Sequence, residues 1–334
     1  MNVLITGGLG FIGSHTCVEL LNSGYEITII DNLYNSKRDV IDRIKKITGK
    51  DFKCYIGDVC DNIVVNKIFN ENKIDAVIHF AGYKAVGESV EKPIEYYSNN
   101  LMSTLVLCDV MRNHGCKKFV FSSSATVYGS PKSVPIKEDF DLGPTTNPYG
   151  TTKLMIEKIL EDIYISDNKW NVALLRYFNP IGAHESGLLG ESPNDIPNNL
   201  LPYIVKVANK ELPFLNVWGN DYPTPDGTGV RDYIHVVDLA KGHVSAIQKL
   251  EKETIGVDTY NLGTGKGYSV LDIVNAFSNI NGIDVPYEIK ERRAGDIATC
   301  YADTSKAYNE LGWSAEKGID DMMRDSWNFL KKNS

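Results

Sequence analysis

Short runs of apolar and β-branched residues alternate with longer helical patterns through the first half of the chain. The apolar runs predict strands at 2–6, 26–31, 52–56, 76–81, 118–123 and 172–177. Segments with helical spacing lie between them, for example at 12–23, 99–113 and 149–165. Fully apolar strands separated by helices are typical of a parallel sheet that is covered on both faces. The pattern therefore predicts an α/β fold with a doubly wound parallel sheet, which binds ligands at the carboxyl ends of its strands.

The pattern changes after about residue 180. Residues 186–197 are rich in Gly, Pro, Asn and Ser and predict an irregular excursion. Further helices are expected at 200–209, 237–248 and 269–279, with short strands at 259–262 and 287–290. We expect residues 1–180 to form the sheet domain, to which a later segment near 230–262 returns. Residues 181–334 should form a smaller mixed α/β lobe.

Composition narrows the class of protein. The 334 residues carry a formal net charge of -8, which argues against a general nucleic-acid binder. No apolar run approaches the roughly 20 residues of a membrane helix, and no targeting segment precedes the first strand, so a cytoplasmic location is expected. The six cysteines form no C-x-x-C pair and fit buried thiols better than disulfides or zinc. The six histidines form no HExxH-like cluster, and no metal is expected.

Four glycines, Gly7, Gly8, Gly10 and Gly13, follow the first predicted strand and open the first helix. A tight turn needs positive φ, and a diphosphate must approach bare backbone amides at a helix N-terminus. Glycine meets both demands. With a strand before it and a helix after it, this turn predicts a dinucleotide site of the Rossmann type.

Asp31 ends the second predicted strand, 18 residues beyond Gly13. A carboxylate at this point accepts hydrogen bonds from the ribose 2′-hydroxyl and repels a 2′-phosphate, so NAD is favoured over NADP. Lys37 and Arg38 lie nearby and could hold a phosphate, although solvated loop charges are the more economical interpretation.

Tyr149 and Lys153 stand four residues apart at the start of a predicted helix and so share one face. A tyrosine becomes a base near neutral pH only if its pKa falls by about 3 units, and a nearby ammonium favours that shift. Ser124 lies at the end of the strand 118–123, where its hydroxyl could share a proton with Tyr149. Serines that close strands are also common as caps and turn formers.

Taken in order, these motifs resemble the extended short-chain dehydrogenase/reductase family, and within it the nucleotide-sugar epimerase branch. The resemblance runs nearly end to end. It is carried by Thr6-Gly-Gly-Leu-Gly-Phe-Ile-Gly13, Asp31-Asn-Leu33, His79-Phe-Ala-Gly-Tyr-Lys84, Phe121-Ser-Ser-Ser-Ala-Thr-Val-Tyr-Gly129, Asn147-Pro-Tyr-Gly-Thr-Thr-Lys153, Arg176-Tyr-Phe-Asn-Pro-Ile-Gly182, Gly227-Thr-Gly-Val-Arg-Asp-Tyr-Ile-His235 and Arg292-Arg-Ala-Gly-Asp296. The early motifs are shared across the superfamily, whereas the later ones are closer to the epimerase branch.

The resemblance implies an isomerase that needs NAD and works as a homodimer. The implied reaction is reversible epimerisation at carbon 4 of UDP-glucose and UDP-galactose through a 4-keto sugar, in galactose metabolism. The resemblance implies that Ser124, Tyr149 and Lys153 are the catalytic residues. The resemblance places these three residues around NAD together with Gly7, Gly10, Phe11, Ile12, Gly13, Asp31, Asn32, Leu33, Asn35, Ser36, Asp58, Val59, Phe80, Ala81, Gly82, Lys84, Asn99 and Phe178. It places the UDP-sugar against Lys84, Ser124, Tyr149, Asn179, Asn199, Leu200, Asn216, Val217, Trp218, Arg231, Arg293, Asp296 and Cys300.

Cys300 bears on the range of substrates. In family members restricted to the smaller hexoses, a tyrosine tends to occupy this position and crowds the sugar's 2-substituent. Cysteine is far smaller, so we predict room for an N-acetyl group and activity on UDP-N-acetylglucosamine and UDP-N-acetylgalactosamine. The alternative is that neighbouring side chains close the space.

Three other functions remain to be weighed. A sugar-nucleotide 4,6-dehydratase usually carries Asp-Glu after its serine or threonine, but here Ala125 and Thr126 follow Ser124. A uronate epimerase would share the same early motifs. A non-catalytic NAD-binding regulator would be expected to have lost Tyr149 or Lys153.

The helices 99–113 and 149–165 have apolar stripes wider than one buried face requires, which suits a dimer or a helix covered by the second lobe.

Overall fold

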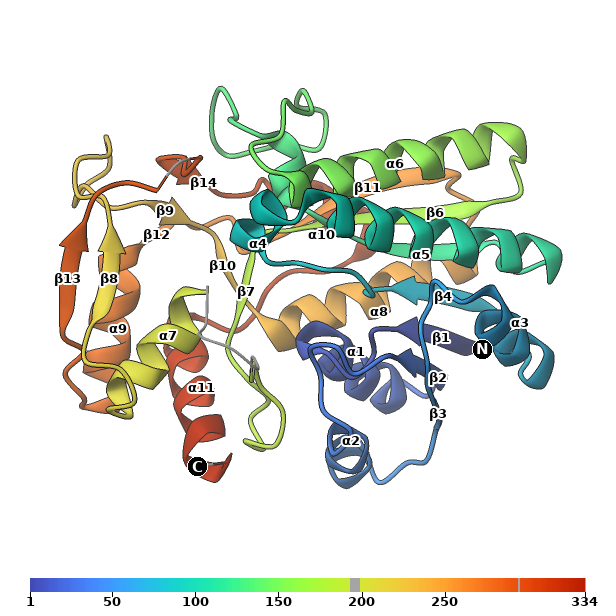
Figure 1. The fold of residues 1–334 in the computed structure, drawn as a ribbon, viewed down its shortest axis with the longest axis horizontal. Coiled ribbons are helices and arrows are strands. Elements are labelled where there is room, and N and C mark those ends of the chain that lie inside the picture. The colour runs from blue at the N-terminus through green and yellow to red at the C-terminus, as the bar shows by residue number, and fades with distance from the viewer. Residues whose placement is uncertain (193–198, 294, 334) are drawn as a thin grey trace.

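Seven parallel strands form the central sheet, in the spatial order β11-β6-β5-β4-β1-β2-β3 (Figure 1). This computed structural model describes residues 1–192, 199–293 and 295–333. The strands are β1 (Asn2–Thr6), β2 (Glu26–Asp31), β3 (Lys53–Ile56), β4 (Ala76–His79), β5 (Lys118–Ser124), β6 (Asn171–Tyr177) and β11 (Val257–Leu262). The order reverses between β1 and β4, which makes this edge the expected ligand-binding crevice. The predicted doubly wound α/β fold is confirmed.

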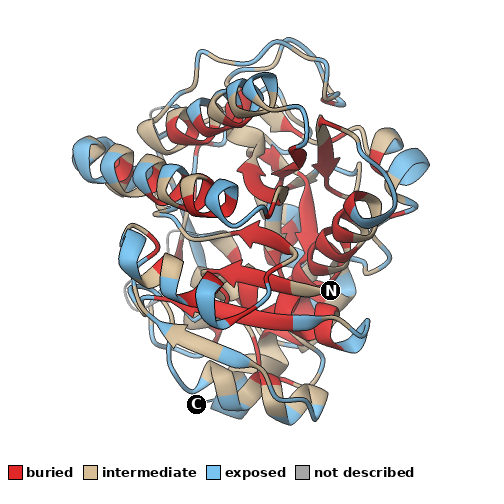
Figure 2. Ribbon diagram, turned by 90° about the vertical axis from the view of Figure 1, so that its right-hand side faces the viewer, coloured by how far each residue is buried: buried red, intermediate tan, exposed pale blue. Residues whose placement is uncertain are grey.

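The strands are apolar throughout because both faces of the sheet are covered. In β1, Val3 and Ile5 belong to one core cluster, while Leu4 lies between them and belongs to the other. Successive side chains of a strand point to opposite faces, so a strand buried on both sides needs an apolar residue at every position. Figure 2 shows the buried residues concentrated in these central strands.

Two layers of helices cover the sheet. One core cluster draws on α1 (Phe11–Asn22), α2 (Val40–Thr48) and α8 (Val236–Lys252). The other draws on α3 (Asn62–Glu71), α5 (Pro93–Asn113) and α6 (Pro148–Ser166). The sequence placed the start of α5 at residue 99, but the helix begins at Pro93. Proline suits this first position because its fixed φ is helical and its missing N–H would have had no partner within the helix.

The second half of the chain builds a smaller lobe with its own core, to which Ile204, Phe277 and Met323 contribute. Its main elements are α7 (Leu200–Ala208), β8 (Leu215–Trp218), α9 (Val270–Asn281), β13 (Tyr287–Lys290) and α11 (Ile319–Asn333). Shorter elements of the chain are α4 (Val86–Glu91), η1 (Ala125–Tyr128), β7 (Asn179–Ile181), β9 (Val230–Arg231), β10 (Tyr233–His235), β12 (Tyr268–Ser269), β14 (Thr299–Cys300) and α10 (Ser305–Leu311).

The chain crosses between the two parts of the molecule. After α7 and β8 it returns to place α8 beside α1 and to pair β11 with β6. The boundary that we set at residue 180 stays a prediction. Of the predicted irregular excursion at 186–197, residues 193–197 lie outside the described residues, and Ala183 and Gly190 form an isolated bridge at its base.

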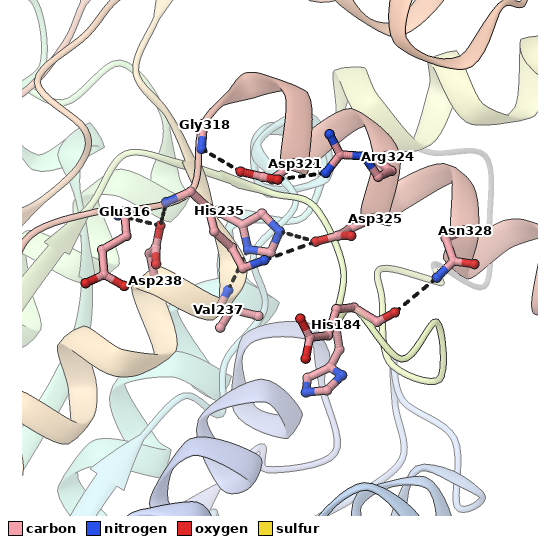
Figure 3. Close-up of polar contacts among 12 residues, drawn as sticks. His184, His235, Val237, Asp238, Glu316, Gly318, Asp321, Arg324, Asp325 and Asn328 are labelled. Carbon is pink, nitrogen blue, oxygen red and sulfur yellow. Dashed lines mark hydrogen bonds and ion pairs between the residues drawn. The ribbon is translucent and has the colours of Figure 1, made fainter.

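A buried histidine connects the C-terminal helix to the start of α8 (Figure 3). The Nδ1 atom of His235 accepts a hydrogen bond from the amide of Val237 (3.1 Å) and thereby caps α8. Its Nε2 atom lies 3.1 Å from the Oδ2 of Asp325 in α11. Asp238 accepts hydrogen bonds from the amides of Glu316 and Lys317, which precede α11. These contacts tie α11 to the layer of helices that covers the sheet.

Two searches of the described residues bear on other classes of site. No helix among them is long and apolar enough to cross a membrane. No group of three or more His, Cys, Asp or Glu side chains in that part of the chain could hold a metal ion. All six cysteines are free thiols, and Cys17, Cys108, Cys116 and Cys300 are buried.

Candidate active site

The glycine turn lies between the carboxyl end of β1 and the start of α1. Gly7 has a φ of +68°, and a Cβ there would come within 2.9 Å of the amide nitrogen of Ala81. A Cβ at Gly13 would come within 2.3 Å of the carbonyl oxygen of Gly7. Glycine is therefore required at both places, once for the backbone conformation and once for the close approach of the helix to the turn.

The start of α1 fits the diphosphate of a dinucleotide. Its N-cap, Gly10, makes no side-chain capping hydrogen bond, so the first turn presents backbone amides to an incoming anion. Phe11 and Ile12 form this first turn, and the switch point of the sheet lies beside it. The residues present thus fit NAD, as the sequence predicted.

Asp31 organises the loop around the predicted adenosine site. Its carboxylate is buried and accepts hydrogen bonds from the amide of Leu9 (3.0 Å), the amide of Leu33 (2.9 Å) and the hydroxyl of Ser36 (2.6 Å). A carboxylate offers about four acceptor positions, so one remains for a ribose hydroxyl. Leu33 holds a φ of 60°, which is unusual for a residue with a side chain. Lys37, weighed earlier as a phosphate ligand, instead donates to Ser192 at 3.4 Å.

The other predicted cofactor residues follow the carboxyl ends of β2, β3, β4 and β6 or lie on α5. They are Asn32 and Asn35 after β2, Asp58 and Val59 after β3, Phe80 to Lys84 after β4, Phe178 after β6, and Asn99 on α5. The ring of Phe80 packs against His243 of α8, with 4.8 Å between the ring centroids. The structure therefore brings these positions to one edge of the sheet, where the parallel strands end.

Ser124, Tyr149 and Lys153 meet where β5 ends and α6 begins. The hydroxyl of Tyr149 hydrogen-bonds to Ser124. The Nζ atom of Lys153 donates to the carbonyl oxygen of Ser122 (2.5 Å) and lies 5.8 Å from the centre of the Tyr149 ring. Asn147 caps α6 by accepting a hydrogen bond from the amide of Gly150, which fixes the start of the helix beside the strand end.

Thr126, to which the sequence assigns no role in the site, orients the Ser124 hydroxyl. The Oγ of Ser124 accepts hydrogen bonds from the amide of Thr126 (3.2 Å) and from its hydroxyl (3.0 Å). A serine hydroxyl has two acceptor positions and one proton. Because Thr126 fills both acceptor positions, the proton of Ser124 is left to donate to Tyr149. A donor of this kind stabilises a phenolate.

Burial sets the charge states of the two titrating groups. It raises the pKa of Tyr149 to about 12, and the hydrogen bond with Ser124 only partly opposes the rise. It lowers the pKa of Lys153 to about 8, against the attraction of Glu157. Tyr149 is thus a neutral phenol at pH 7, and a further positive charge beside it is needed before it can act as a base.

A buried ion pair lies behind Lys153, and sequence reasoning missed it. The carboxylate of Glu157 is bound in forked geometry by Arg176, with Nε to Oε1 at 3.0 Å and Nη2 to Oε2 at 2.8 Å. The hydroxyl of Ser123 donates to Oε1 at 2.5 Å. Glu157 stands four residues after Lys153, so the spacing of charged residues on one helix face was the available signal.

The predicted substrate residues lie on several elements and do not share one set of contacts. Arg231 of β9 pairs in register with Cys300 of β14, and its guanidinium donates to the carbonyl of Val230 at 2.9 Å. Arg293 pairs with Asp296 (2.9 Å) and lies over the ring of Trp218 at 6.0 Å. The two arginines therefore have different partners here. Asn179 lies in β7, and Asn216 and Val217 lie with Trp218 in β8.

Glu191 is a second site residue whose role the sequence does not predict. Its Oε1 atom accepts hydrogen bonds from the Nζ of Lys84 (2.9 Å) and from the Nδ2 of Asn199 (2.8 Å). Asn199 is the N-cap of α7, and Leu200 is the first residue of that helix. One carboxylate thus binds two predicted ligand contacts, one in the loop after β4 and the other at the start of α7.

Comparison with known proteins agrees with this geometry. The profile of the family described as GDP-mannose 4,6 dehydratase matches residues 4–326. UDP-glucose 4-epimerase from Bacillus subtilis (strain 168) is 61% identical over 333 residues, which cover 100% of this chain and 98% of that protein. The chain belongs to the UDP-glucose 4-epimerase family. A second member of the epimerase family, from Haemophilus influenzae, is 60% identical over 100% of this chain and 98% of its own.

A solved structure from the epimerase family has the same fold. The crystal structure of UDP-glucose 4-epimerase from Bifidobacterium longum, in complex with NAD+ and UDP, superposes with a TM-score of 0.97. It is 60% identical and covers 100% of this chain and 99% of its own. Membership in the epimerase family rests on the whole length of the chain and not on the glycine turn alone.

Proposed function

We propose that this chain catalyses the NAD-dependent, reversible epimerisation of UDP-glucose and UDP-galactose at carbon 4. It is an isomerase that passes through a 4-keto sugar and ends with no net redox change. The observation that carries the proposal is the meeting of Ser124, Tyr149 and Lys153 at the same edge of the parallel sheet as the glycine turn. Full-length identity to UDP-glucose 4-epimerases supports the same assignment.

The residues of the chain divide the work between proton transfer and placement. Tyr149 acts as a phenolate, which a hydrogen bond from Ser124 stabilises; it takes the proton from the hydroxyl on carbon 4 and becomes a neutral phenol. Lys153 supplies a fixed positive charge close to the Tyr149 ring. NAD held by the glycine turn and Asp31 would supply the hydride acceptor for carbon 4 and the positive charge that lowers the pKa of Tyr149.

The diphosphate would be held by positive charge from both sides of the crevice. Arg231, Arg293 and Lys84 supply that charge, and arginine binds phosphate oxygens in forked geometry. Asn179, Asn199, Leu200 and the β8 residues Asn216 to Trp218 complete the predicted UDP-sugar site. A UDP-sugar bound there would compete with Glu191 for Lys84, because the carboxylate and the diphosphate are both anions.

We extend the substrate range to the N-acetylated UDP-hexoses. Cys300 is 9% exposed and pairs in register with Arg231, so it faces the same part of the lobe as a predicted phosphate ligand. Burial raises the pKa of its thiol to about 11, so the side chain is a small neutral group. A small group at this point leaves more room for the 2-substituent than a tyrosine would.

The rival functions lack support in this site. A 4,6-dehydratase needs an acid and a base after its serine, whereas Ala125 has no polar group and Thr126 is engaged with Ser124. A non-catalytic regulator has no need of the contacts that Tyr149 and Lys153 make. The relatives at 61% and 60% identity are UDP-glucose 4-epimerases, which argues against a uronate epimerase.

We further propose a cytoplasmic homodimer. Met102 and Leu105 of α5 expose 49% and 45% of their surface, and Met155 of the adjacent α6 exposes 42%. Three large apolar side chains on two neighbouring helices form a patch that a second copy of the chain would cover. In such a dimer, α5 and α6 would each pack one apolar face against the sheet and another against the partner, which explains their wide apolar stripes.

The deciding experiment offers the purified chain UDP-galactose and UDP-N-acetylgalactosamine separately, without added NAD, and follows the sugar products by NMR. Conversion of both to their gluco epimers is expected. The matched variant is Cys300→Tyr, which should keep turnover of UDP-galactose and lose at least about tenfold on the N-acetylated sugar. No turnover of either sugar, even with NAD supplied, would overturn the proposed function. Turnover of UDP-galactose alone would overturn only the wider range.

A further inference from the structure

The ion pair of Glu157 and Arg176 is buried directly behind the catalytic lysine. Glu157 exposes 2% of its surface and Arg176 exposes 4%. Arg176 extends from β6, stacks over the ring of Tyr128 and donates to its hydroxyl at 2.9 Å. A third donor, Ser123, reaches Glu157 from β5. The pair therefore joins α6 to the ends of two active-site strands.

Stability alone is a weak explanation for such a pair. Removing two charges from water costs several kcal/mol for each ion, and well-packed apolar residues of similar volume are often as stable. The cost is met here with three charge-assisted hydrogen bonds to one carboxylate. A group maintained at this cost beside a catalytic site is a candidate for a part in the chemistry.

The geometry relates Glu157 to Lys153. The two side chains are one helical turn apart on the same face of α6, and adjacent residues of β5 bind them. The carbonyl of Ser122 accepts from Lys153, and the hydroxyl of Ser123 donates to Glu157. Two hydrogen bonds from neighbouring residues of β5 thus fix α6 against β5. The face of α6 that they hold carries Tyr149 and Lys153, and β5 carries Ser124.

We propose that Glu157 is a positioning residue for the epimerisation, which holds Lys153 at the end of β5 and supplies the counter-charge that keeps it an ammonium ion. The inference rests on the proposed function. In this proposal Glu157 acts through Lys153 and contacts neither the substrate nor the cofactor. Arg176 and Ser123 bind the Glu157 carboxylate, and its attraction favours a charge on Lys153.

The other groups around Lys153 do not supply this counter-charge. On its own helix it faces the neutral ring of Tyr149. From β4 it faces His79, whose pKa is lowered to about 3 by burial and by Lys153 itself, so this imidazole is neutral. From β5 it contacts the Phe121 ring and the Ser122 carbonyl.

Around Glu157 the charged neighbour is Arg176 of β6, with Tyr128 of η1 beyond it and the half-buried carboxyl of Glu138 in the following loop. Among the described residues, Glu157 is the anion whose attraction opposes the desolvation of Lys153. Neutralising Glu157 should therefore let Lys153 lose its proton at a lower pH.

The test variant is Glu157→Gln, which keeps the shape and removes the charge. In the NAD-loaded enzyme, kcat for UDP-galactose measured from pH 6 to 10 should fall off on the alkaline side about one pH unit earlier than in the wild type. Glu161→Gln is the matched control, because Glu161 lies one turn further along α6, is exposed and pairs with the surface residue Lys158. Its profile should stay at the wild-type position.

A second measurement does not depend on activity. The ε-carbon resonance of Lys153 in lysine-labelled protein, assigned by its loss in Lys153→Met, reports the charge of the side chain as the pH is raised. We expect its midpoint to drop by about one unit in Glu157→Gln and to be unchanged in Glu161→Gln. The conservative variant Glu157→Asp should recover part of the shift.

The outcomes separate a positioning role from a structural one. If Glu157→Gln lowers kcat equally at every pH and leaves the Lys153 midpoint in place, Glu157 is merely structural and the inference fails. If Glu157→Gln does not fold, the double variant Glu157→Gln/Arg176→Met removes the orphaned guanidinium and must show the shifted midpoint. Absence of epimerase activity in the wild type would defeat the proposed function, but the Lys153 titration would still decide the inference.

Discussion

At the scale of single residues, Asp31 does two things at once. Its carboxylate closes the glycine turn through Leu9 and the following loop through Leu33 and Ser36. It also keeps one acceptor position for a ribose hydroxyl. The loop that receives the adenosine is thus built around the same group that selects the cofactor.

Asp31→Asn should weaken NAD binding by about 10- to 100-fold. The amide can replace only part of the acceptor set, and hydrogen bonds to a charged group contribute about 1.5–3 kcal/mol. Discrimination against NADP should narrow, because the negative charge that repels a 2′-phosphate is gone. Dissociation constants for both nucleotides, measured by fluorescence on protein stripped of cofactor, check this. Ser36→Ala, which removes a single bond to the same carboxylate, should lose less than tenfold. Equal losses in the two variants would contradict the dual role.

The sequence identified Asp31 as a site residue but did not identify Glu157, Thr126 or Glu191. Asp31 follows a strand at a fixed distance from a glycine turn, so its position in the chain determines its place in the fold. The other three act through partners that are distant in sequence or through the proton of a neighbour. Glu157 meets Arg176, 19 positions away, and Glu191 meets Lys84, 107 positions away. Only the fold reveals such pairs.

At the scale of elements, the contact between α1 and the glycine turn is the tightest approach in the nucleotide site. A Cβ at Gly13 would lie 2.3 Å from a backbone oxygen, which cannot yield in the way that a flexible side chain can. Gly87, near the start of α4, is also helical, but a Cβ there meets nothing within 4 Å. The two positions form a matched pair.

Gly13→Ala should push α1 away from the turn, destabilise the chain by about 1–3 kcal/mol and weaken NAD binding. Gly87→Ala should be neutral or stabilise by up to about 1 kcal/mol, because alanine is the better helix former. Urea unfolding and NAD titration of both variants provide the comparison. A Gly13→Ala chain as stable as the wild type, with unchanged NAD affinity, would show that the helix can move at no cost.

The sequence predicts an element correctly where the run of apolar residues is long and its spacing fits only one kind of secondary structure. β1 and β2 begin and end where the apolar runs do, because a strand buried on both faces has no polar position to blur its ends. β13 also has its predicted bounds, although most of its residues are exposed. Strands of two or three residues, such as β9, β12 and β14, carry no period and were missed. α2 and α3 were also left out, since only Ile44 of α2 is fully buried and α3 buries three of its residues.

At the scale of the whole molecule, the two parts of the chain share a buried polar seam and not only apolar contacts. α8 packs on α1, and its N-cap His235 is bound to Asp325 of the C-terminal helix (Figure 3). Burial alone would raise the pKa of Asp325, but the hydrogen bond with His235 and the charge of Lys317 outweigh it and lower the pKa. Asp325 therefore carries its negative charge at neutral pH, where the enzyme is proposed to work.

Among the buried histidines of the described residues, His15, His79 and His243 have pKa values that burial lowers strongly. Burial lowers their pKa values from 6.5 to about 3, about 3 and about 4. A histidine whose pKa is lower in the folded chain takes up a proton on unfolding once the pH drops below about 6.5. Their contribution to stability is thus complete above that pH and is lost as the pH falls toward the folded values.

Below pH 6 each of these histidines should remove about 1.4 kcal/mol of unfolding free energy per pH unit, so the three together make a slope of about 4 kcal/mol per unit. Urea unfolding between pH 6 and 5 measures it. His79→Asn takes one titrating group out of the core, and although the variant starts less stable, its slope should be shallower by about 1.4 kcal/mol per pH unit. His114→Asn is the control, because His114 is exposed, and its slope should match the wild type. If His79→Asn and His114→Asn show the same slope, the acid sensitivity of the fold arises elsewhere than in its buried imidazoles.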